Sequence, residues 1–134
     1  MKLPGNPKTY RLATVAWMAV ITILSHQPGS TLGSFSWLSP ELANLLHIPS
    51  YGLLALLAWL GFSVYFRNRA SAVMGILLFT LLFATFDEWH QSFVPGRVPS
   101  LPDILNDLLG AGLALLVAVL FRLHTTEAGR QKVT

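Results

Sequence analysis

The sequence contains no cysteine and few charged residues. Without cysteine the chain forms no disulfide and performs no thiolate chemistry, although this absence leaves its cellular compartment undecided. Charged residues make up 11% of the 134 positions, whereas hydrophobic residues make up 53%. A soluble domain normally carries about 25% charged residues. The chain also lacks internal repeats, low-complexity segments and the aromatic and basic platform typical of nucleic-acid binding. These absences favour a membrane protein with a single domain, residues 1–134, and no nucleic-acid partner.

Four long apolar runs indicate membrane-spanning helices. They cover about residues 10–25, 47–66, 70–86 and 104–123. At about 1.5 Å of rise per residue, helices of this length cross most or all of a hydrocarbon core about 30 Å thick. The first run lacks the small-residue cleavage site of a signal peptide. The predicted fold class is therefore all-α, an integral membrane four-helix bundle. A short interfacial helix is also expected over about residues 40–46, because Ser39 can cap a helix that begins with Pro40.

The basic residues predict how this bundle is oriented. Short cytoplasmic loops of membrane proteins are enriched in lysine and arginine. Apart from Arg97, every lysine and arginine lies at or before the start of the first run, between the second and third runs, or at or after the end of the fourth: Lys2, Lys8, Arg11, Arg67, Arg69, Arg122, Arg130 and Lys132. Both termini are therefore expected to be cytoplasmic, and both longer loops extracytoplasmic. The net charge of +3 reflects this topology and contact with anionic membrane lipid.

Most polar chemistry of the chain lies around the loop between the third and fourth runs. Its members are Asp87, Glu88, Gln91, Arg97, Ser100, Asp103, Asn106 and Asp107. Membrane proteins keep ionisable groups near their spans mainly for paired structure or for function, because burial of an unpaired charge is costly. Any activity of the protein is therefore expected in this segment, at the extracytoplasmic face.

Helical spacing sorts these polar residues into groups, because residues three or four positions apart share a face. Asp103 can in addition cap the fourth helix, and Gln27 lies where the first run closes. All four outer ends thus bring polar groups to the same membrane level. The groups on shared faces are Asp87 with Gln91, Glu88 with Gln91, His47 with Tyr51, and Asp103 with Asn106 and Asp107.

In order and spacing these residues resemble the VanZ-like family of small bacterial membrane proteins. The similarity extends over about residues 24–112. The chain departs from the family at Ala43-Asn44, where relatives usually carry an Asp-Lys pair before their histidine. The matching elements are Ser25-x-Gln27-Pro28, His47-x-x-x-Tyr51, Asp87-Glu88-x-x-Gln91 and Pro95-Gly96-Arg97, followed by Ser100, Asp103, Asn106 and Gly110.

This resemblance implies a multi-pass protein of the bacterial inner or plasma membrane with a role in the cell envelope. The family takes its name from a protein linked to resistance against the glycopeptide antibiotic teicoplanin. The resemblance suggests action on the cell surface or on its lipid-linked precursors, and it implies no established reaction.

The first function that the residues support is binding of a cell-surface or lipid-linked precursor headgroup. The planar guanidinium of Arg97 suits phosphate oxygens, and neutral hydrogen-bonding side chains can complete the contact. The expected ligand-binding residues are Arg97, Gln91, Asn106, Tyr51, Gln27 and Asp107.

The second function is catalysis on a lipid-linked phosphate or pyrophosphate. A positioned acid or base would then move a proton, and the candidates are Asp87, Glu88, Asp103 and His47. The chain contains no familiar phosphatase or metalloprotease motif, so neither a metal nor a cofactor is expected.

A third interpretation is structural. Arg97 would neutralise a neighbouring acid and hold the bundle together, and the protein would act as a scaffold, an oligomer or the partner of another membrane protein. In the fourth run, Gly110 and Gly112 are expected to permit close helix contact.

Overall fold

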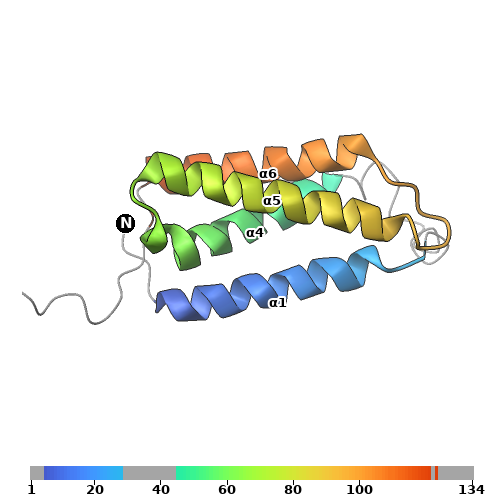
Figure 1. Ribbon diagram of the computed structural model, residues 1–134, viewed down its shortest axis with the longest axis horizontal. Helices are drawn as coiled ribbons and strands as arrows, with labels where there is room; N and C mark the ends of the chain where they lie inside the picture. The colour runs from blue at the N-terminus through green and yellow to red at the C-terminus, as the bar shows by residue number, and fades with distance from the viewer. Residues whose placement is uncertain (1–4, 29–44, 122, 124–134) are drawn as a thin grey trace, which may run out of the picture.

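The computed structural model describes residues 5–28, 45–121 and 123 of the chain. These residues form four α-helices and a short 3-10 helix: α1 (Pro7–Ser25), α4 (His47–Phe62), η1 (Ser63–Tyr65), α5 (Arg69–Gln91) and α6 (Leu101–Leu120). Successive α-helices run in opposite directions, so the ends of α1 and α5 meet the starts of α4 and α6 (Figure 1). The described residues contain no strand, which confirms the all-α fold class for this part of the chain. The helix expected over residues 40–46 lies mostly outside the described residues.

Local sequence explains where α1 and α5 begin. The Asn6 side chain accepts a hydrogen bond of 3.0 Å from the backbone N–H of Lys8, and Pro7 occupies the first helical position. Asn68 and Ser71 form a reciprocal capping box at the start of α5.

The start of α6 and the end of α5 differ from the sequence prediction. Ser100 is the N-cap of α6 and accepts from the backbone N–H of Asp103 at 3.4 Å, so the expectation that Asp103 caps this helix is wrong. The third apolar run was expected to end at about residue 86, whereas α5 continues through Gln91. The reason is that the charged residues in this last turn, Asp87 and Glu88, point into the bundle and do not interrupt the helix.

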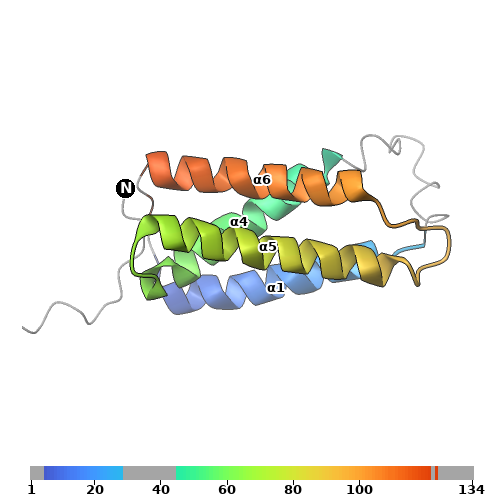
Figure 2. The same cartoon turned by 45° about the horizontal axis from the view of Figure 1, so that its top comes forward.

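Helix α4 packs against the other three helices, and its interface with α6 is the most extensive in the bundle (Figures 1 and 2). A Cβ atom on Gly110 would clash with the backbone carbonyl of Ile48, and one on Gly52 would lie 3.2 Å from the Gly110 carbonyl oxygen. Small residues at such crossings let two backbones approach closely. Gly110 therefore has the predicted role. For Gly112 the prediction is wrong, because a Cβ there would meet nothing within 4 Å.

The polarity of the bundle is the reverse of that in a water-soluble protein. Leu105, Leu109 and Leu113 follow one face of α6 and are each more than half exposed. Thr80 and Asp87, in contrast, are buried inside. Large apolar patches on a surface mark contact with another apolar phase. The exterior therefore suits lipid.

Three helical segments are long and apolar enough to cross a membrane: His47–Tyr65, Arg69–Gln91 and Leu101–Leu120. They correspond to the second, third and fourth predicted spans. Helix α1 is not among them, and it carries Lys8 and Arg11 in its first two turns. The described helices thus support a multi-pass membrane protein, while a fourth span through α1 stays a prediction.

The end of the bundle where α4 finishes and α5 begins is held by contacts of long side chains. Arg11 donates from Nε to the Gly61 carbonyl at 2.8 Å, and its guanidinium lies 4.5 Å from the centre of the Tyr65 ring. The Trp59 indole N–H donates to the Leu123 carbonyl at 2.8 Å. A pocket of about 260 Å³ opens beside these contacts, with mostly apolar walls and with Ser63, Asn68 and Arg69 as polar members. It lies far from the polar segment identified in the sequence.

Replacement of Gly110 by alanine should destabilise the bundle, because the added methyl group meets the Ile48 carbonyl. Overpacking of this kind costs about 1 to 3 kcal/mol. The measurement is the temperature at which half of the detergent-solubilised protein loses its monodisperse elution. Gly112→Ala is the matched control on the same helix and should leave this temperature unchanged or raise it. Equal behaviour of the two variants would contradict the assigned crossing.

Candidate functional site

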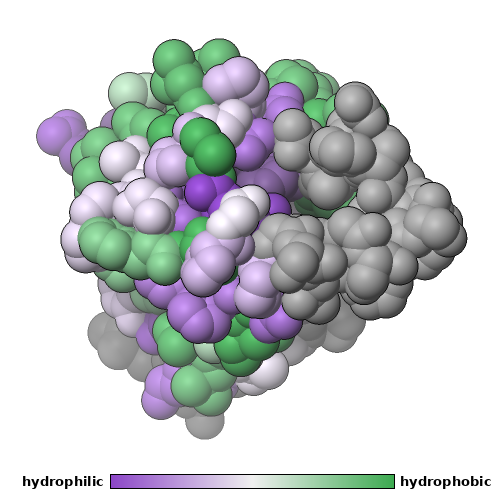
Figure 3. Space-filling model, turned by 90° about the vertical axis from the view of Figure 1, so that its right-hand side faces the viewer, coloured by the Kyte–Doolittle hydropathy of each residue, from purple (hydrophilic) through white to green (hydrophobic). Residues whose placement is uncertain are grey.

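Polar side chains from all four α-helices meet at the end of the bundle where α5 finishes and α6 begins. Figure 3 views this end and shows hydrophilic residues gathered at its centre, with hydrophobic residues above, below and to the left of them. The bundle core below it is apolar. The most deeply buried polar members, each less than 10% exposed, are Ser25, Tyr51, Asp87, Glu88, Gln91, Asp103 and Asp107.

A tight turn positions Arg97. Pro95 and Gly96 are its central residues, Gly96 has a φ of +75°, and the Arg97 N–H donates to the Val94 carbonyl at 3.1 Å. Proline followed by glycine suits a turn whose second central residue needs positive φ. The turn directs the Arg97 side chain back over α5, where Nε and Nη2 donate to the Gln91 side-chain oxygen at 3.2 and 2.8 Å. A neutral amide therefore holds the arginine, and no carboxylate of the described residues forms an ion pair with it.

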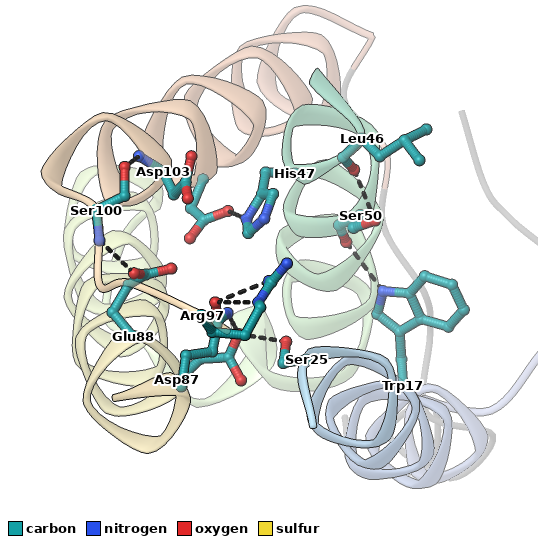
Figure 4. Close-up of polar contacts among 12 residues, drawn as sticks. Trp17, Ser25, Leu46, His47, Ser50, Asp87, Glu88, Arg97, Ser100 and Asp103 are labelled. Carbon is teal, nitrogen blue, oxygen red and sulfur yellow. Dashed lines mark hydrogen bonds and ion pairs between the residues drawn. The ribbon is translucent and has the colours of Figure 1, made fainter. Parts of the chain in front are cut away.

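Asp87 connects α5 to α1. Its Oδ2 atom accepts hydrogen bonds from the Ser25 hydroxyl at 2.7 Å and from the Gln91 amide at 3.3 Å (Figure 4). The rings of His26 and His90 stack nearby with their centres 5.2 Å apart. Because Gln91 also holds Arg97, one continuous chain of hydrogen bonds runs from α1 through α5 to the turn. The other oxygen of Asp87, Oδ1, is buried without a hydrogen-bond partner.

Glu88 connects α5 to the start of α6. Its Oε2 atom accepts from the Ser100 backbone N–H at 2.7 Å. Figure 4 shows the side chains of Glu88 and Asp103 on the same side of the site, where the two helices face each other. Glu88 Oε1 and Asp103 Oδ1 are both buried without a hydrogen-bond partner.

His47 and Asp107 connect α4 to α6 through a contact of 2.9 Å between Nδ1 and Oδ1. An ionised carboxylate can only accept a hydrogen bond. If Asp107 is ionised, Nδ1 of His47 therefore carries the hydrogen. One helical turn further along α4, the Tyr51 ring lies nearly parallel to the His47 ring, at 6.3 Å and 9°. The buried Tyr51 hydroxyl lies near Asp87 but completes no hydrogen bond of ordinary geometry.

Two residues expected at the site stand apart from these contacts. Gln27 donates to the carbonyl of Ile23 in its own helix at 3.1 Å, on an exposed surface. Asn106 is only half-buried, and none of the side-chain hydrogen bonds among the described residues involves it. The structure brings together the other expected residues: Asp87, Glu88, Gln91, Arg97, Asp103, Asp107, His47 and Tyr51.

Two contributors stand in the sequence motifs but were not among the expected catalytic or ligand-binding residues. They are the Ser25 hydroxyl and the Ser100 backbone N–H. Ser25 was detectable, because Thr14, Ile21 and Ser25 follow each other at seven and four residues and lie on the buried face of α1. The Ser100 N–H carries no such signal, since its bond to Glu88 depends on how α6 begins.

The acidic groups of the site outnumber the basic ones. Four carboxylates are more than 90% buried here, whereas among the residues that the structure describes only Arg97 and His47 contribute basic side chains to these contacts. Buried polar atoms normally have hydrogen-bond partners. No three His, Asp or Glu side chains of the described residues converge where they could hold a metal ion. The site thus offers one arginine with spare donors and several separate acceptor oxygens.

In the described residues, an all-helical bundle with a lipid-compatible exterior and buried acids at one end is the architecture of a multi-pass membrane protein with a polar site at one end. The VanZ/LLP1 family model matches residues 10–122 of the chain. The chain therefore belongs to the VanZ/LLP1 family, which confirms the resemblance seen in the sequence. No significant match was found among curated proteins or among solved structures.

The contact between His47 and Asp107 should contribute measurably to stability. We expect His47→Ala and Asp107→Ala each to destabilise the protein, and the double variant to lose less than the sum of both. The coupling free energy expected for contacting residues is about 0.5 to 3 kcal/mol. It can be measured by unfolding in mixed detergent and SDS micelles. In the control cycle, Gln27→Ala and Asp107→Ala share no partner and should be additive. Additivity of the His47 cycle would show that the contact has no energetic weight.

Proposed function

We propose that this protein binds the phosphate-bearing headgroup of a cell-surface or lipid-linked envelope precursor at its polar end, without changing it. In this proposal the polar end faces the extracytoplasmic side of a bacterial inner or plasma membrane. Capture of a precursor there would alter how the envelope is built or recognised, and resistance to a glycopeptide such as teicoplanin is one such outcome.

The observation that carries this proposal is that a neutral side chain, and not a carboxylate, holds the guanidinium of Arg97. Its guanidinium is fixed by the Gln91 amide oxygen through Nε and Nη2, although buried carboxylates lie on the neighbouring helices. A guanidinium has five N–H donors, so donors remain for a ligand. Because Gln91 is neutral, the positive charge is oriented but not cancelled. Oriented arginine of this kind suits bidentate contact with phosphate.

The hydrogen bonds around Gln91 also explain how the arginine is held in place without a ligand. Asp87 fixes the Gln91 amide through its Nε2, which leaves the Oε1 atom turned toward Arg97. Ser25 in turn fixes Asp87. Preorganisation reduces the entropy lost when a ligand binds. The three residues behind Arg97 therefore act as its support.

Catalysis on a lipid-linked phosphate or pyrophosphate is the second candidate. It is favoured by the unpartnered oxygens of Glu88 and Asp103, since a carboxylate without a hydrogen-bond partner is free to take a proton. The two functions differ in one observable, which is whether the mass of the bound lipid changes.

Arg97→Ala should strongly reduce retention of the ligand while leaving the bundle folded. The measurement is mass spectrometry of purified protein mixed with polyprenyl-linked envelope precursors, with retained and altered lipid both recorded. Loss of charged hydrogen bonds worth about 1.5 to 3 kcal/mol predicts a decrease of tenfold or more. Arg67→Ala is the matched control, because Arg67 is exposed at the opposite end of α5 and should have no effect.

Three results would lead away from binding. Altered lipid that forms only with the wild-type protein would establish an enzyme. Aggregation of Arg97→Ala in detergent would favour a structural arginine. The absence of both retained and altered lipid would favour a scaffold that acts through a membrane-protein partner.

The orientation in the proposal can be tested with single cysteines, because the natural chain has none. Val98→Cys lies in the loop between α5 and α6 and is strongly exposed, and Ala70→Cys lies at the start of α5. In intact cells a membrane-impermeant maleimide should label position 98 and not position 70. Both positions should react after the membrane is permeabilised. The reverse pattern would place the polar end in the cytoplasm.

A further inference from the structure

The binding of phosphate by Arg97 leaves the acidic half of the site unexplained. Three carboxylate oxygens, one each on Asp87, Glu88 and Asp103, are buried and have no hydrogen-bond partner. These side chains are 2%, 4% and 7% exposed, respectively. Burial of a charged group without a partner costs several kcal/mol. A site built in this way is incomplete until a donor reaches these oxygens.

The acidic and basic groups occupy different sides of the site. In Figure 4 the side chains of Glu88 and Asp103 lie together where α5 faces α6, whereas the Arg97 guanidinium extends toward His47 on α4. The Arg97 guanidinium donates hydrogen bonds to Gln91 and not to the carboxylates of Glu88 or Asp103. A ligand across this end of the bundle would meet one strong donor and, beside it, a group of acceptors.

The acceptors suit an organic cation better than a metal ion. No three His, Asp or Glu side chains of the described residues are arranged to hold one ion. A hydroxyl group would satisfy a single oxygen but would bring no charge. An ammonium group brings three N–H donors and one positive charge. It can therefore satisfy more than one of these oxygens and reduce the excess of negative charge.

We infer that the headgroup bound by this protein carries an ammonium group beside its phosphate, and that Glu88 and Asp103 bind the ammonium group. This inference rests on the proposed function and specifies its ligand as zwitterionic. The second oxygen of Glu88 stays engaged by the Ser100 N–H, so the residue can bind a ligand without releasing the start of α6. Asp87 holds Gln91 and contributes to the negative field, but its partnered oxygen belongs to the support of Arg97.

The test compares two probe lipids that differ only in the amine. Detergent-solubilised protein is mixed with dioleoyl phosphatidylethanolamine or with its N-acetylated derivative, and retained lipid is measured by mass spectrometry. Both probes have the same phosphate and acyl chains, whereas acetylation removes the positive charge. Loss of one charged hydrogen-bonding group predicts a preference for the free amine of about tenfold or more.

Glu88→Gln and Asp103→Asn should each lower the ratio of retained free-amine lipid to retained N-acetylated lipid toward one. Retention of the N-acetylated probe itself should not change. The amide of Glu88→Gln keeps an oxygen that can accept from the Ser100 N–H. The hydrogen bond between α5 and the start of α6 is therefore available in the wild-type protein and in the variant. Elution as a monodisperse peak checks folding, and Asp103→Asn provides a second variant that leaves this contact untouched. The control variant is again Arg67→Ala, because Arg67 is exposed at the opposite end of α5 and its replacement should have no effect on either probe.

The outcomes separate this inference from the proposed function. Equal retention of both probes by the wild-type protein, lost in Arg97→Ala, would leave phosphate binding in place and overturn the ammonium site. A preference that survives in both Glu88→Gln and Asp103→Asn would overturn the assignment to these residues. Retention of neither probe would contradict both the ammonium site and phosphate binding of this kind.

Discussion

The close crossing of α4 and α6 determines the geometry of the polar end. Because Gly110 has no side chain, the backbone of α6 can lie directly against the Ile48 carbonyl of α4. The first turn of α4 then comes within hydrogen-bonding distance of α6, and His47 meets Asp107 at 2.9 Å. A larger residue at this crossing would separate the two helices and open that contact. The polar residues of the other helices are arranged around this pair.

The surrounding lipid imposes a second constraint on the same residues. In water, acids near the end of a helix would turn outward and be solvated, but the exterior of this bundle carries leucines such as Leu105 and Leu109. Polar groups within the hydrocarbon layer must find partners inside the protein. Ser25, Gln91 and the Ser100 N–H provide such partners for one oxygen each of Asp87 and Glu88. The oxygens left over are the ones that we propose a ligand contacts, so the stability of the bundle and the proposed binding site depend on the same side chains.

The sequence predicted the all-α fold, the approximate limits of the helices and most members of the site, because each of these follows from short-range periodicity. Apolar runs placed α4, α5 and α6 within a few residues, and spacing of four placed Gln91 beside Asp87. The sequence predictions failed where they depended on the direction in which a side chain points from its helix. Gln27 and Ser25 are two residues apart, yet only Ser25 lies on the buried face of α1. Likewise, the third apolar run predicts a helix end at about residue 86, although the inward direction of Asp87 and Glu88 lets α5 continue to Gln91.

Composition and periodicity alone thus establish a helical membrane protein whose polar residues gather at one end, because lipid requires long apolar helices and confines charges to favourable positions. The pairing among those residues required the folded bundle. Arg97 could have met Asp87, Glu88 or Asp103 by sequence distance, and instead it contacts Gln91, because the turn at Pro95 and Gly96 returns it to α5. The same packing leaves Glu88 and Asp103 with unpartnered oxygens. Such choices depend on distances between helices, which are set by the contacts at Gly52 and Gly110 and not by the spacing of residues along one helix.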